Sequence, residues 1–463
     1  MKYTQNRIKI ISLVGDILSN GSNQIYGMSK SHSKYMSYSR LLESKFLRTE
    51  KLHKCLLPKV IEEITVETLL SSDKPEVCPD GGCSDVVLNA VKQIKPKFLI
   101  IQDGSEIRKP ESNDMEKLQK VRALDGKLVN GYRSVASIAV SEDNQECFLL
   151  EMNTFSCKEK GYVSDNDIEL KMIKNASKLR SIASLVYVLD RRYDSFNFMD
   201  QINTQKDKFI IRVKSLDRKV FTIKKGFKSN LPLPQETLDA IASDKIIDTR
   251  CGQFPIKESN IVKVKELRLK CGTYYNVKIY YWHNEILIPD PLGIKGNISC
   301  TVIQVLLRDS KNKLIYVNPM YLITNQVGLT KQGVIDTYFH YLQRHGIEQV
   351  FKFMKTTLNL EKFQIKKLGQ IKKLISITFL ASAYFYMNRR GILEDPVLLE
   401  EIKQICELGK GKGKIGLKYL KQGIESLNNI FQVFEWKKRY NISDEKIIQI
   451  AKRYGFYVES GLV

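Results

Sequence analysis

Two short apolar runs, each closing on an aspartate, constrain the fold of this chain more than any other feature of its sequence. The run KFLIIQDGS starts at Lys97 and reaches Asp103, and SLVYVLDRRYDSF repeats the design around Asp190. Each run predicts a buried strand with a carboxylate at its C-terminal end. The residues between them predict two further strands and one helix, over 131–140, 146–152 and 167–182. Strands that alternate with helices in this way indicate a mixed α/β core.

The expected organisation changes again further along the chain. After a strand at 208–214, residues 215–325 show strand patterns alone, separated by turn residues. We expect a β-rich domain there, inserted into the α/β unit. Helical patterns fill both ends of the chain. The resulting division is a helical N-terminal region at 1–95, the first part of the core at 96–214, the inserted domain at 215–325, the rest of the core at 326–390 and a helical C-terminal region at 391–463.

The stretch YLQRHGIEQVFKFMK, residues 341–355, follows the β-rich region and carries a third notable acid. On one α-helix, four of its side chains fall along a single stripe: Tyr341, Arg344, Glu348 and Lys355. Because Arg and Lys neutralise phosphate oxygens and Glu binds cations, this stripe suits a metal ion beside a phosphodiester. The alternative interpretation is a solvated surface helix with ordinary charge pairs three and four residues apart.

The charge balance of the chain favours a polyanionic partner. Lys and Arg number 74 against 51 Asp and Glu, a net charge of +23. With ordinary apolar content, this excess indicates nucleic acid rather than a membrane. We expect two basic groups to contribute to binding, one in the N-terminal helix and one near residue 370: Arg40, Lys45, Arg48 and Lys51, and Lys362, Lys366, Lys367, Lys372 and Lys373.

Other residue types exclude several classes of protein. The nine cysteines form no CxxC pair and only five histidines accompany them. Free thiols in a reduced cytoplasmic protein are therefore expected rather than zinc sites or disulfides. The most apolar helix, 374–387, is too short to span a bilayer and is expected to be a buried core helix.

The three acids together predict a metal site. Neighbouring strand ends can place Asp103 and Asp190 a few ångström apart, and a packed helix can deliver Glu348. Such a cluster is unfavourable unless cations neutralise it. Magnesium binds carboxylates and phosphate oxygens, and two ions about 3.5–4 Å apart would suit phosphodiester chemistry. An aspartate after a strand is also a common turn or cap residue, so that interpretation stays open for either one.

These residues carry a resemblance to a known family. The chain resembles bacterial insertion-sequence transposases of the DDE type, in the branch with the tyrosine–arginine–glutamate–lysine signature. The pattern Y-(2)-R-(3)-E-(6)-K is matched in full between residues 341 and 355. The motifs around the two aspartates resemble IIQDGS and LDRRYDSF, and KFIIRVK resembles the strand that follows. The resemblance covers roughly residues 95–390.

The resemblance implies an RNase H-like mixed sheet flanked by helices and interrupted by a β-rich domain. It also implies a magnesium-dependent enzyme, for which Mn²⁺ would substitute, acting in the bacterial cytoplasm at the nucleoid. Such an enzyme binds the terminal inverted repeats of its own element, cleaves there and joins the 3′-hydroxyls to target DNA. Since one chain supplies one set of three acids and an element has two ends, we expect a homodimer on DNA. The implied metal ligands are Asp103, Asp190 and Glu348. The implied DNA-phosphate contacts are Tyr341, Arg344 and Lys355.

Two alternatives to an active transposase remain open from the sequence. One is another RNase H-like nuclease that uses the same metal chemistry without joining strands. The other is a DNA-binding protein that has lost catalysis. The chain also departs from relatives that stack a flipped base on a tryptophan before the signature helix. The corresponding stretch NPMYLITN offers Tyr321 instead, and Trp282 is expected to belong to the core.

Overall fold

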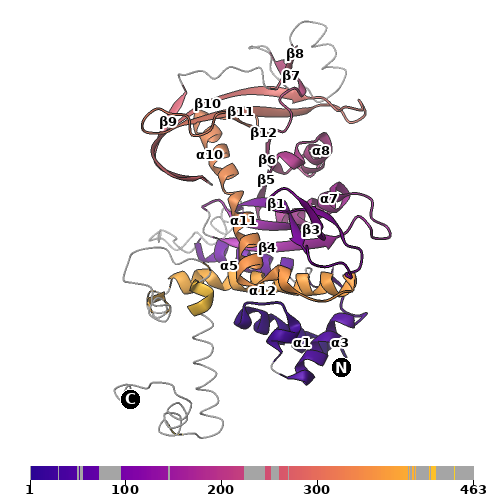
Figure 1. Cartoon of the computed structure of the whole chain (residues 1–463). Coiled ribbons are helices and arrows are strands. Elements are labelled where there is room, and N and C mark those ends of the chain that lie inside the picture. The colour runs from indigo at the N-terminus through magenta and orange to yellow at the C-terminus, as the bar shows by residue number, and fades with distance from the viewer. Residues whose placement is uncertain are drawn as a thin grey trace, which may run out of the picture.

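The structure of the chain is a computed structural model dominated by one large sheet of twelve strands with helices on both faces (Figure 1). It describes residues 2–29, 31–49, 52, 56–71, 95–143, 146–223, 246–251, 260–269, 271–394 and scattered positions from 396 to 443. The strand order is β2-β3-β1-β5-β6-β12-β11-β10-β7-β8, with β4 on β3 and β9 on β10. The expected mixed α/β class is therefore confirmed.

The five strands at the centre of the α/β core follow the sequence expectation closely. They are β1 (Lys97–Arg108), β3 (Leu128–Ser141), β4 (Cys147–Phe155), β5 (Ser184–Leu189) and β6 (Lys208–Arg212). β1 pairs antiparallel with β3 and parallel with β5, and β5 pairs parallel with β6. β4 pairs antiparallel with the outer edge of β3, and β2 (Gln119–Arg122) pairs with the start of β3.

One strand end differs from the prediction. β1 does not stop at Asp103 but continues to Arg108, because β3 provides pairing partners along the full length of β1. On its other side, the parallel ladder with β5 ends at the pair Gln102 and Leu189. Asp103 therefore lies just past the end of the ladder with β5 but within the ladder with β3. The pairing with β3 holds its backbone in place.

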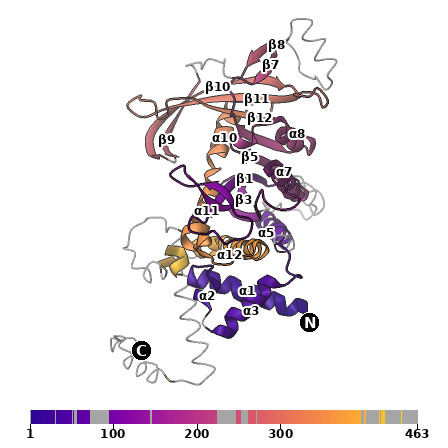
Figure 2. The same ribbon diagram turned by 45° about the vertical axis from the view of Figure 1, so that its right-hand side comes forward.

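The strands of the β-rich region extend this same sheet. β12 (Met320–Thr324) pairs antiparallel with β6, and the order continues through β11 and β10. The other members are β7 (Lys219–Ile223), β8 (Ile246–Arg250), β9 (Ile261–Leu269), β10 (Gly272–Ile288) and β11 (Ile298–Arg308). In Figures 1 and 2 they form the upper part of the molecule, and α10 (Lys331–Leu342) descends from them towards the core strands.

Alternating side chains of the core strands divide the apolar core between two faces of the sheet. Leu99 and Ile101 of β1 pack on one face with residues of α10, α11 (His345–Lys352) and α12 (Leu368–Glu394). Phe98 and Ile100 pack on the other face with residues of three further helices: α5 (Leu56–Ser71), α7 (Asp165–Ala176) and α8 (Phe196–Thr204). This alternation is the period-two pattern of strands that are covered on both sides.

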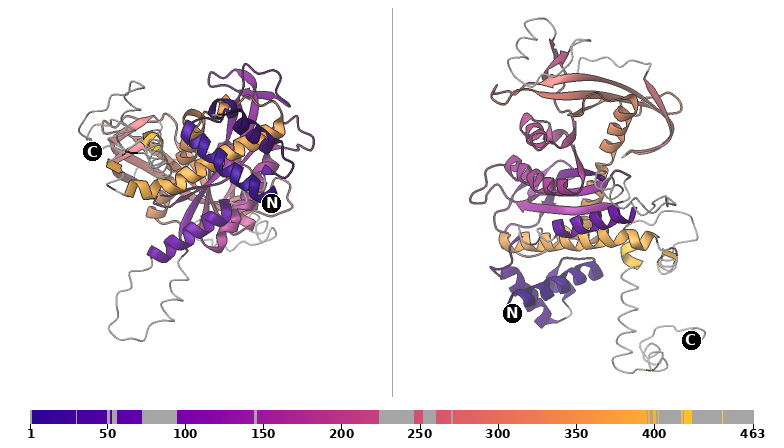
Figure 3. Two further views of the ribbon diagram at one scale, coloured as in Figure 1. Left: turned by 90° about the horizontal axis from the view of Figure 1, so that it is seen from below. Right: turned by 180° about the vertical axis from the view of Figure 1, so that it is seen from behind.

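Helix α12 is a buried helix, as expected from its apolar run. It lies between the sheet and the N-terminal helices α1 (Lys2–Asn20), α2 (Ile25–Met28) and α3 (His32–Glu43) (Figure 3). Lys373 in its first turns donates hydrogen bonds to the carbonyls of Leu42 and Ser44, where α3 ends. No described helix is long and apolar enough to cross a membrane.

The N-terminal region differs in detail from the expectation. The helix that carries Arg40 begins at His32, with Ser31 accepting a hydrogen bond from the amide of Lys34. It ends at Glu43, so the basic residues Lys45 and Arg48 follow the helix rather than continue it. Lys51 and most of the expected C-terminal helical region, 391–463, lie outside the described residues.

Candidate functional site

The two aspartates predicted from the strand ends lie side by side. Gln102 and Leu189 are the last pair of the parallel ladder between β1 and β5, and each is followed directly by an aspartate, Asp103 and Asp190. Neighbouring strands are about 4.8 Å apart. Successive side chains of a strand alternate between the two faces of the sheet. By this alternation, both aspartates lie on the same face as the buried residues that pack against α11. Two carboxylates thus occupy adjacent positions on one face.

The third acid, Glu348, reaches Asp103 through an arginine. Glu348 lies in the first turn of α11, and Arg344 precedes that helix. One guanidinium nitrogen of Arg344 donates to Asp103 Oδ2 at 2.7 Å and the other to Glu348 Oε1 at 2.5 Å. His345 Nδ1 lies 3.2 Å from the other oxygen of Glu348. Arg344 therefore bridges an acid on the sheet and an acid on the helix.

Burial and neighbouring charges shift the pKa values of Asp103 and Arg344. Burial raises the pKa of Asp103 to about 6, Arg344 opposes the rise, and the neighbouring Asp190 adds to it. Burial disfavours the charged form of Arg344, but the carboxylates of Asp103 and Glu348 outweigh it and its pKa rises. Shifts of this kind mark charged groups that interact with each other in a partly buried environment.

The signature stretch is not one continuous α-helix, so that expectation was wrong. α10 ends at Leu342, α11 starts at His345, and Lys355 belongs to a π-helical turn, η3 (Phe353–Thr357). The break brings Arg344 over the acids, since the residue sits in the connection between two helices. π-helical turns are rare in proteins, and those that occur are often found at functional sites.

The remaining signature residues are held close to the same strands. Tyr341 is almost fully buried, and Asp190 and Arg212 are both near enough to influence its pKa, which burial raises. Lys355 Nζ donates to the carbonyl of Glu106 on β1 and lies 3.3 Å from Glu361 Oε1. Lys355 is thus anchored three residues beyond Asp103 along β1.

A second charged network lies behind Asp190 and was not foreseen from the sequence. The backbone amide of Arg192 donates to Asp190 Oδ1 at 2.8 Å. Its guanidinium lies 2.9 Å from Asp165 and 2.6 Å from Glu169, both on α7. The same guanidinium also occupies the space next to Gly104, where a Cβ atom would lie 2.9 Å from Arg192 Nη1. Arg192 therefore ties α7 to the backbone beside both aspartates.

The signal for this network was present but weak. Asp165 and Glu169 are four residues apart at the start of a helix, which is an ordinary pattern for a solvated face. Glu169 is instead fully buried. Only the packing of α7 against the sheet distinguishes the two situations.

Glu169 should make the stability of the protein depend on pH. Burial raises its pKa from 4.5 to about 7, with Arg192 opposing the rise. Between these values the folded chain holds a proton that the unfolded chain has lost, so stability should fall as pH rises through this window. The Glu169→Gln variant should lose this slope, worth up to about 3 kcal/mol in free energy of unfolding.

Denaturant unfolding at a series of pH values from 4 to 8 measures this effect. The same substitution at Glu111, an exposed loop residue, is the matched control and should leave the wild-type slope unchanged. Parallel stability curves for wild type and Glu169→Gln would contradict the assignment.

The chemistry of the three acids fits a magnesium ion. Mg²⁺ takes hard oxygen ligands, and Asp103 and Asp190 offer carboxylates from neighbouring strands. Within the described residues, no group of three or more His, Cys, Asp or Glu side chains is close enough to hold a metal ion. Arg344 accounts for this spacing, because its guanidinium lies between Asp103 and Glu348. The ligand types are therefore right for metal binding, and Arg344 supplies positive charge in the present arrangement.

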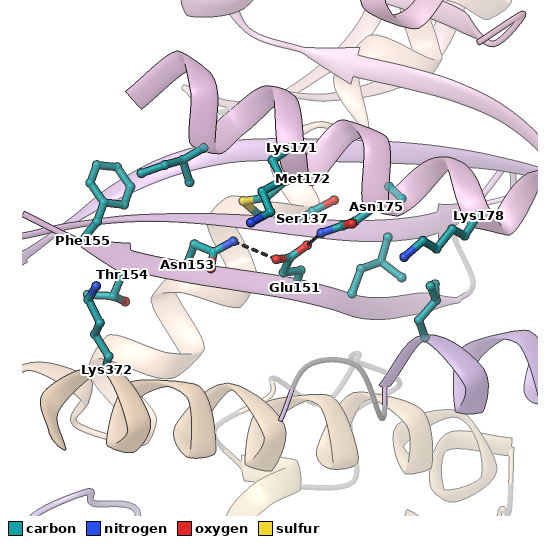
Figure 4. Close-up of a pocket in the computed structure, with 14 residues that line it drawn as sticks. Ser137, Glu151, Asn153, Thr154, Phe155, Lys171, Met172, Asn175, Lys178 and Lys372 are labelled. Carbon is teal, nitrogen blue, oxygen red and sulfur yellow. Dashed lines mark hydrogen bonds between the residues drawn. The ribbon is translucent and has the colours of Figure 1, made fainter. Parts of the chain in front are cut away.

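One cavity lies away from the carboxylate site. A pocket of about 430 Å³ opens between β4, α7 and the side chain of Lys372 (Figure 4). On its floor Glu151 accepts hydrogen bonds from Asn153 and Asn175. It lies on the α7 side of the sheet, while the aspartates face α11, so it does not form part of the carboxylate site.

The comparisons with known proteins add no assignment. A scan of the chain against protein-family models found no match, and a search of curated proteins found none either. The interpretation of the site therefore depends on its residues and their geometry.

Proposed function

We propose that this protein is a magnesium-dependent DNA transposase of the DDE type. The observation that carries the proposal is the adjacency of Asp103 and Asp190 on parallel strands, with Glu348 linked to Asp103 by Arg344. The strand order β4-β3-β1-β5-β6, with three antiparallel strands followed by two parallel ones, supports an RNase H-like core. The complete signature of residues 341–355 and the net charge of +23 support a DNA substrate.

The proposed roles follow from where the residues lie. Asp103, Asp190 and Glu348 would hold Mg²⁺, with Mn²⁺ as a substitute. Bound metal supplies Lewis-acid stabilisation of the attacking and leaving oxygens of a phosphodiester. Arg344 would exchange its carboxylate partners for phosphate oxygens near the cleaved end. Lys355 and the hydroxyl of Tyr341 would contact neighbouring phosphates.

The expected substrates are the terminal inverted repeats of an insertion sequence and a target duplex. One chain carries one set of three acids, whereas an element has two ends. We therefore propose a homodimer assembled on DNA, with one carboxylate set at each end. Two basic chains repel each other without DNA, so the monomer is expected in its absence.

A strand-transfer assay tests this function. Purified protein, Mg²⁺ and duplexes ending in the repeats that flank the coding region should yield cleaved ends and then products joined to a target plasmid. The mass of the complex that cleaves both ends should correspond to two chains. The assay should give no product with duplexes of shuffled sequence.

The outcomes separate the competing functions. Cleavage without any joined product would assign the protein to the RNase H-like nucleases. Specific binding without cleavage in Mg²⁺ or Mn²⁺ would assign it to DNA-binding proteins that have lost catalysis. Cleavage of both ends by a complex with a single chain would contradict the homodimer.

A further inference from the structure

Three cations stand in one row across three neighbouring strands of the sheet. Lys278 of β10 lies directly opposite Lys263 of β9 on one side and Arg308 of β11 on the other. Directly opposed residues of antiparallel strands have Cβ atoms about 4.5–5.5 Å apart and share a face of the sheet. We name Lys263, Lys278 and Arg308 the basic row.

The basic row faces away from the carboxylate site. The residues next to Lys278 along β10, Val277 and Ile279, are fully buried in the cluster that contains residues of α10. Successive side chains of a strand point to opposite faces, so Lys278 points to the other side. Figures 1 and 2 show α10 against one side of β10 and β11. Lys263 is exposed, while Lys278 and Arg308 are half-buried.

The row is electrostatically unfavourable as it stands. Like charges directly opposite each other destabilise a sheet. Within the described part of the chain, no carboxylate forms an ion pair with Lys263 or Lys278, whereas Arg268 nearby is paired with Glu266. Arg308 donates to the carbonyl of Asn312, a neutral partner. A polyanion would relieve the repulsion.

Aromatic side chains accompany the row on the same face. The guanidinium of Arg308 lies 5.7 Å from the ring centre of Tyr280, two residues from Lys278. This contact holds the guanidinium against the sheet surface. Beyond it, Trp282 lies opposite Gln304, which pairs with Tyr321 of β12. A row of cations held on a sheet surface offers charge complementary to the phosphate backbone of a nucleic acid.

We propose that the basic row is a second binding surface for the phosphate backbone of duplex DNA, separate from the carboxylate site. It rests on the proposed function only in taking DNA as the polyanion. The strand spacing sets the three cations about 5 Å apart in a line, so several positive charges lie close together opposite a backbone that carries one negative charge per about 3.4 Å of each strand. Backbone contacts of this kind position a duplex and read no sequence.

The test measures binding of a non-specific duplex to the full chain at a series of salt concentrations, without divalent metal. The triple variant Lys263→Gln, Lys278→Gln, Arg308→Gln should bind at least about tenfold more weakly and lower the slope of log K against log salt by up to about three. The control removes three exposed lysines in α7 and the turn that follows it, Lys171, Lys174 and Lys178, and should keep the wild-type slope. The triple variant should melt at or above the wild-type temperature, because it loses like-charge repulsion.

An unchanged slope in the triple variant, or an equal loss in both variants, would overturn the proposal. So would a loss of binding to poly-glutamate but not to DNA, which would assign the row to an acidic protein. Since the assay uses non-specific DNA and no metal, it stands apart from the strand-transfer assay. If strand transfer fails while the triple variant still shows the expected weaker binding and lower salt slope, the proposed function is overturned and the basic row is not.

Discussion

The Asp190→Asn variant should lose cleavage of terminal-repeat DNA by at least about a thousandfold, equivalent to about 4 kcal/mol of transition-state stabilisation. Asn keeps the shape of the side chain and its ability to accept the amide hydrogen of Arg192, which now bonds to Asp190 Oδ1. It removes the negative charge that a metal ion requires. The local fold should therefore survive while the chemistry does not.

Binding and folding separate this effect from a structural one. The affinity of Asp190→Asn for the repeat duplex, measured in Ca²⁺ or without metal, should stay within about twofold of wild type. The matched control is Asp200→Asn on α8, which removes a carboxylate paired with Lys295 and should leave cleavage near the wild-type rate. A well-folded Asp190→Asn protein that fails to bind DNA, or that still cleaves, would show that Asp190 has another role.

Much of the α/β core was predictable because its strands are buried on both faces. The run before Asp190 contains only apolar residues from Leu185 to Leu189, and all five are buried as expected. A strand that is buried on both faces appears in the sequence as a continuous apolar run, which can be recognised from neighbouring residues alone. The pairing of β1 with β5 was expected for a different reason, since a site shared by Asp103 and Asp190 requires neighbouring strand ends.

Long-range pairing was beyond the reach of the same patterns. Nothing in the residues near Asp103 shows that β3 continues alongside β1 as far as Arg108. Likewise, the register of β12 on β6, which joins the β-rich strands to the core sheet, depends on residues more than 100 positions apart in the chain. Local periodicity predicts that a strand exists, but not which edge it joins.

The candidate site was predictable in its residue types but not in its present contacts. Spacing brought Arg344 and Glu348 to one stripe, and the structure adds that Arg344 also reaches Asp103 on β1. Helix periodicity cannot show this contact, because the contact depends on the break between α10 and α11. The buried state of Glu169 was missed for a related reason, since the packing of one helix decides it.

Replacing Arg344 should destabilise the metal-free protein, because one guanidinium neutralises two acids. The side chains of Arg344, Asp103 and Glu348 are 19%, 17% and 26% exposed. Breaking a buried pair costs about 3–5 kcal/mol, and partial exposure reduces this to about 2 kcal/mol. The Arg344→Gln variant should therefore melt a few degrees below wild type in the presence of EDTA. Arg344→Lys should fall between them, since an ammonium is a single point charge and lacks the fork that spans both acids.

Divalent metal should restore the stability lost in Arg344→Gln if Arg344 acts as the counter-ion of the two acids. Metal would not restore the stability lost with an ordinary structural arginine. Without Arg344, Asp103 and Glu348 would repel each other, and on the proposed function Mg²⁺ or Mn²⁺ would bind the folded state that presents them. The melting temperature of Arg344→Gln should thus rise more on adding metal than that of wild type. Arg180→Gln is the matched control, because Arg180 makes two 2.9 Å hydrogen bonds to Asp207 away from the site. That variant should lose stability without any gain from metal. Equal metal responses in the two variants, or an Arg344→Gln protein as stable as wild type in EDTA, would rule out a role for Arg344 as the counter-ion of these acids.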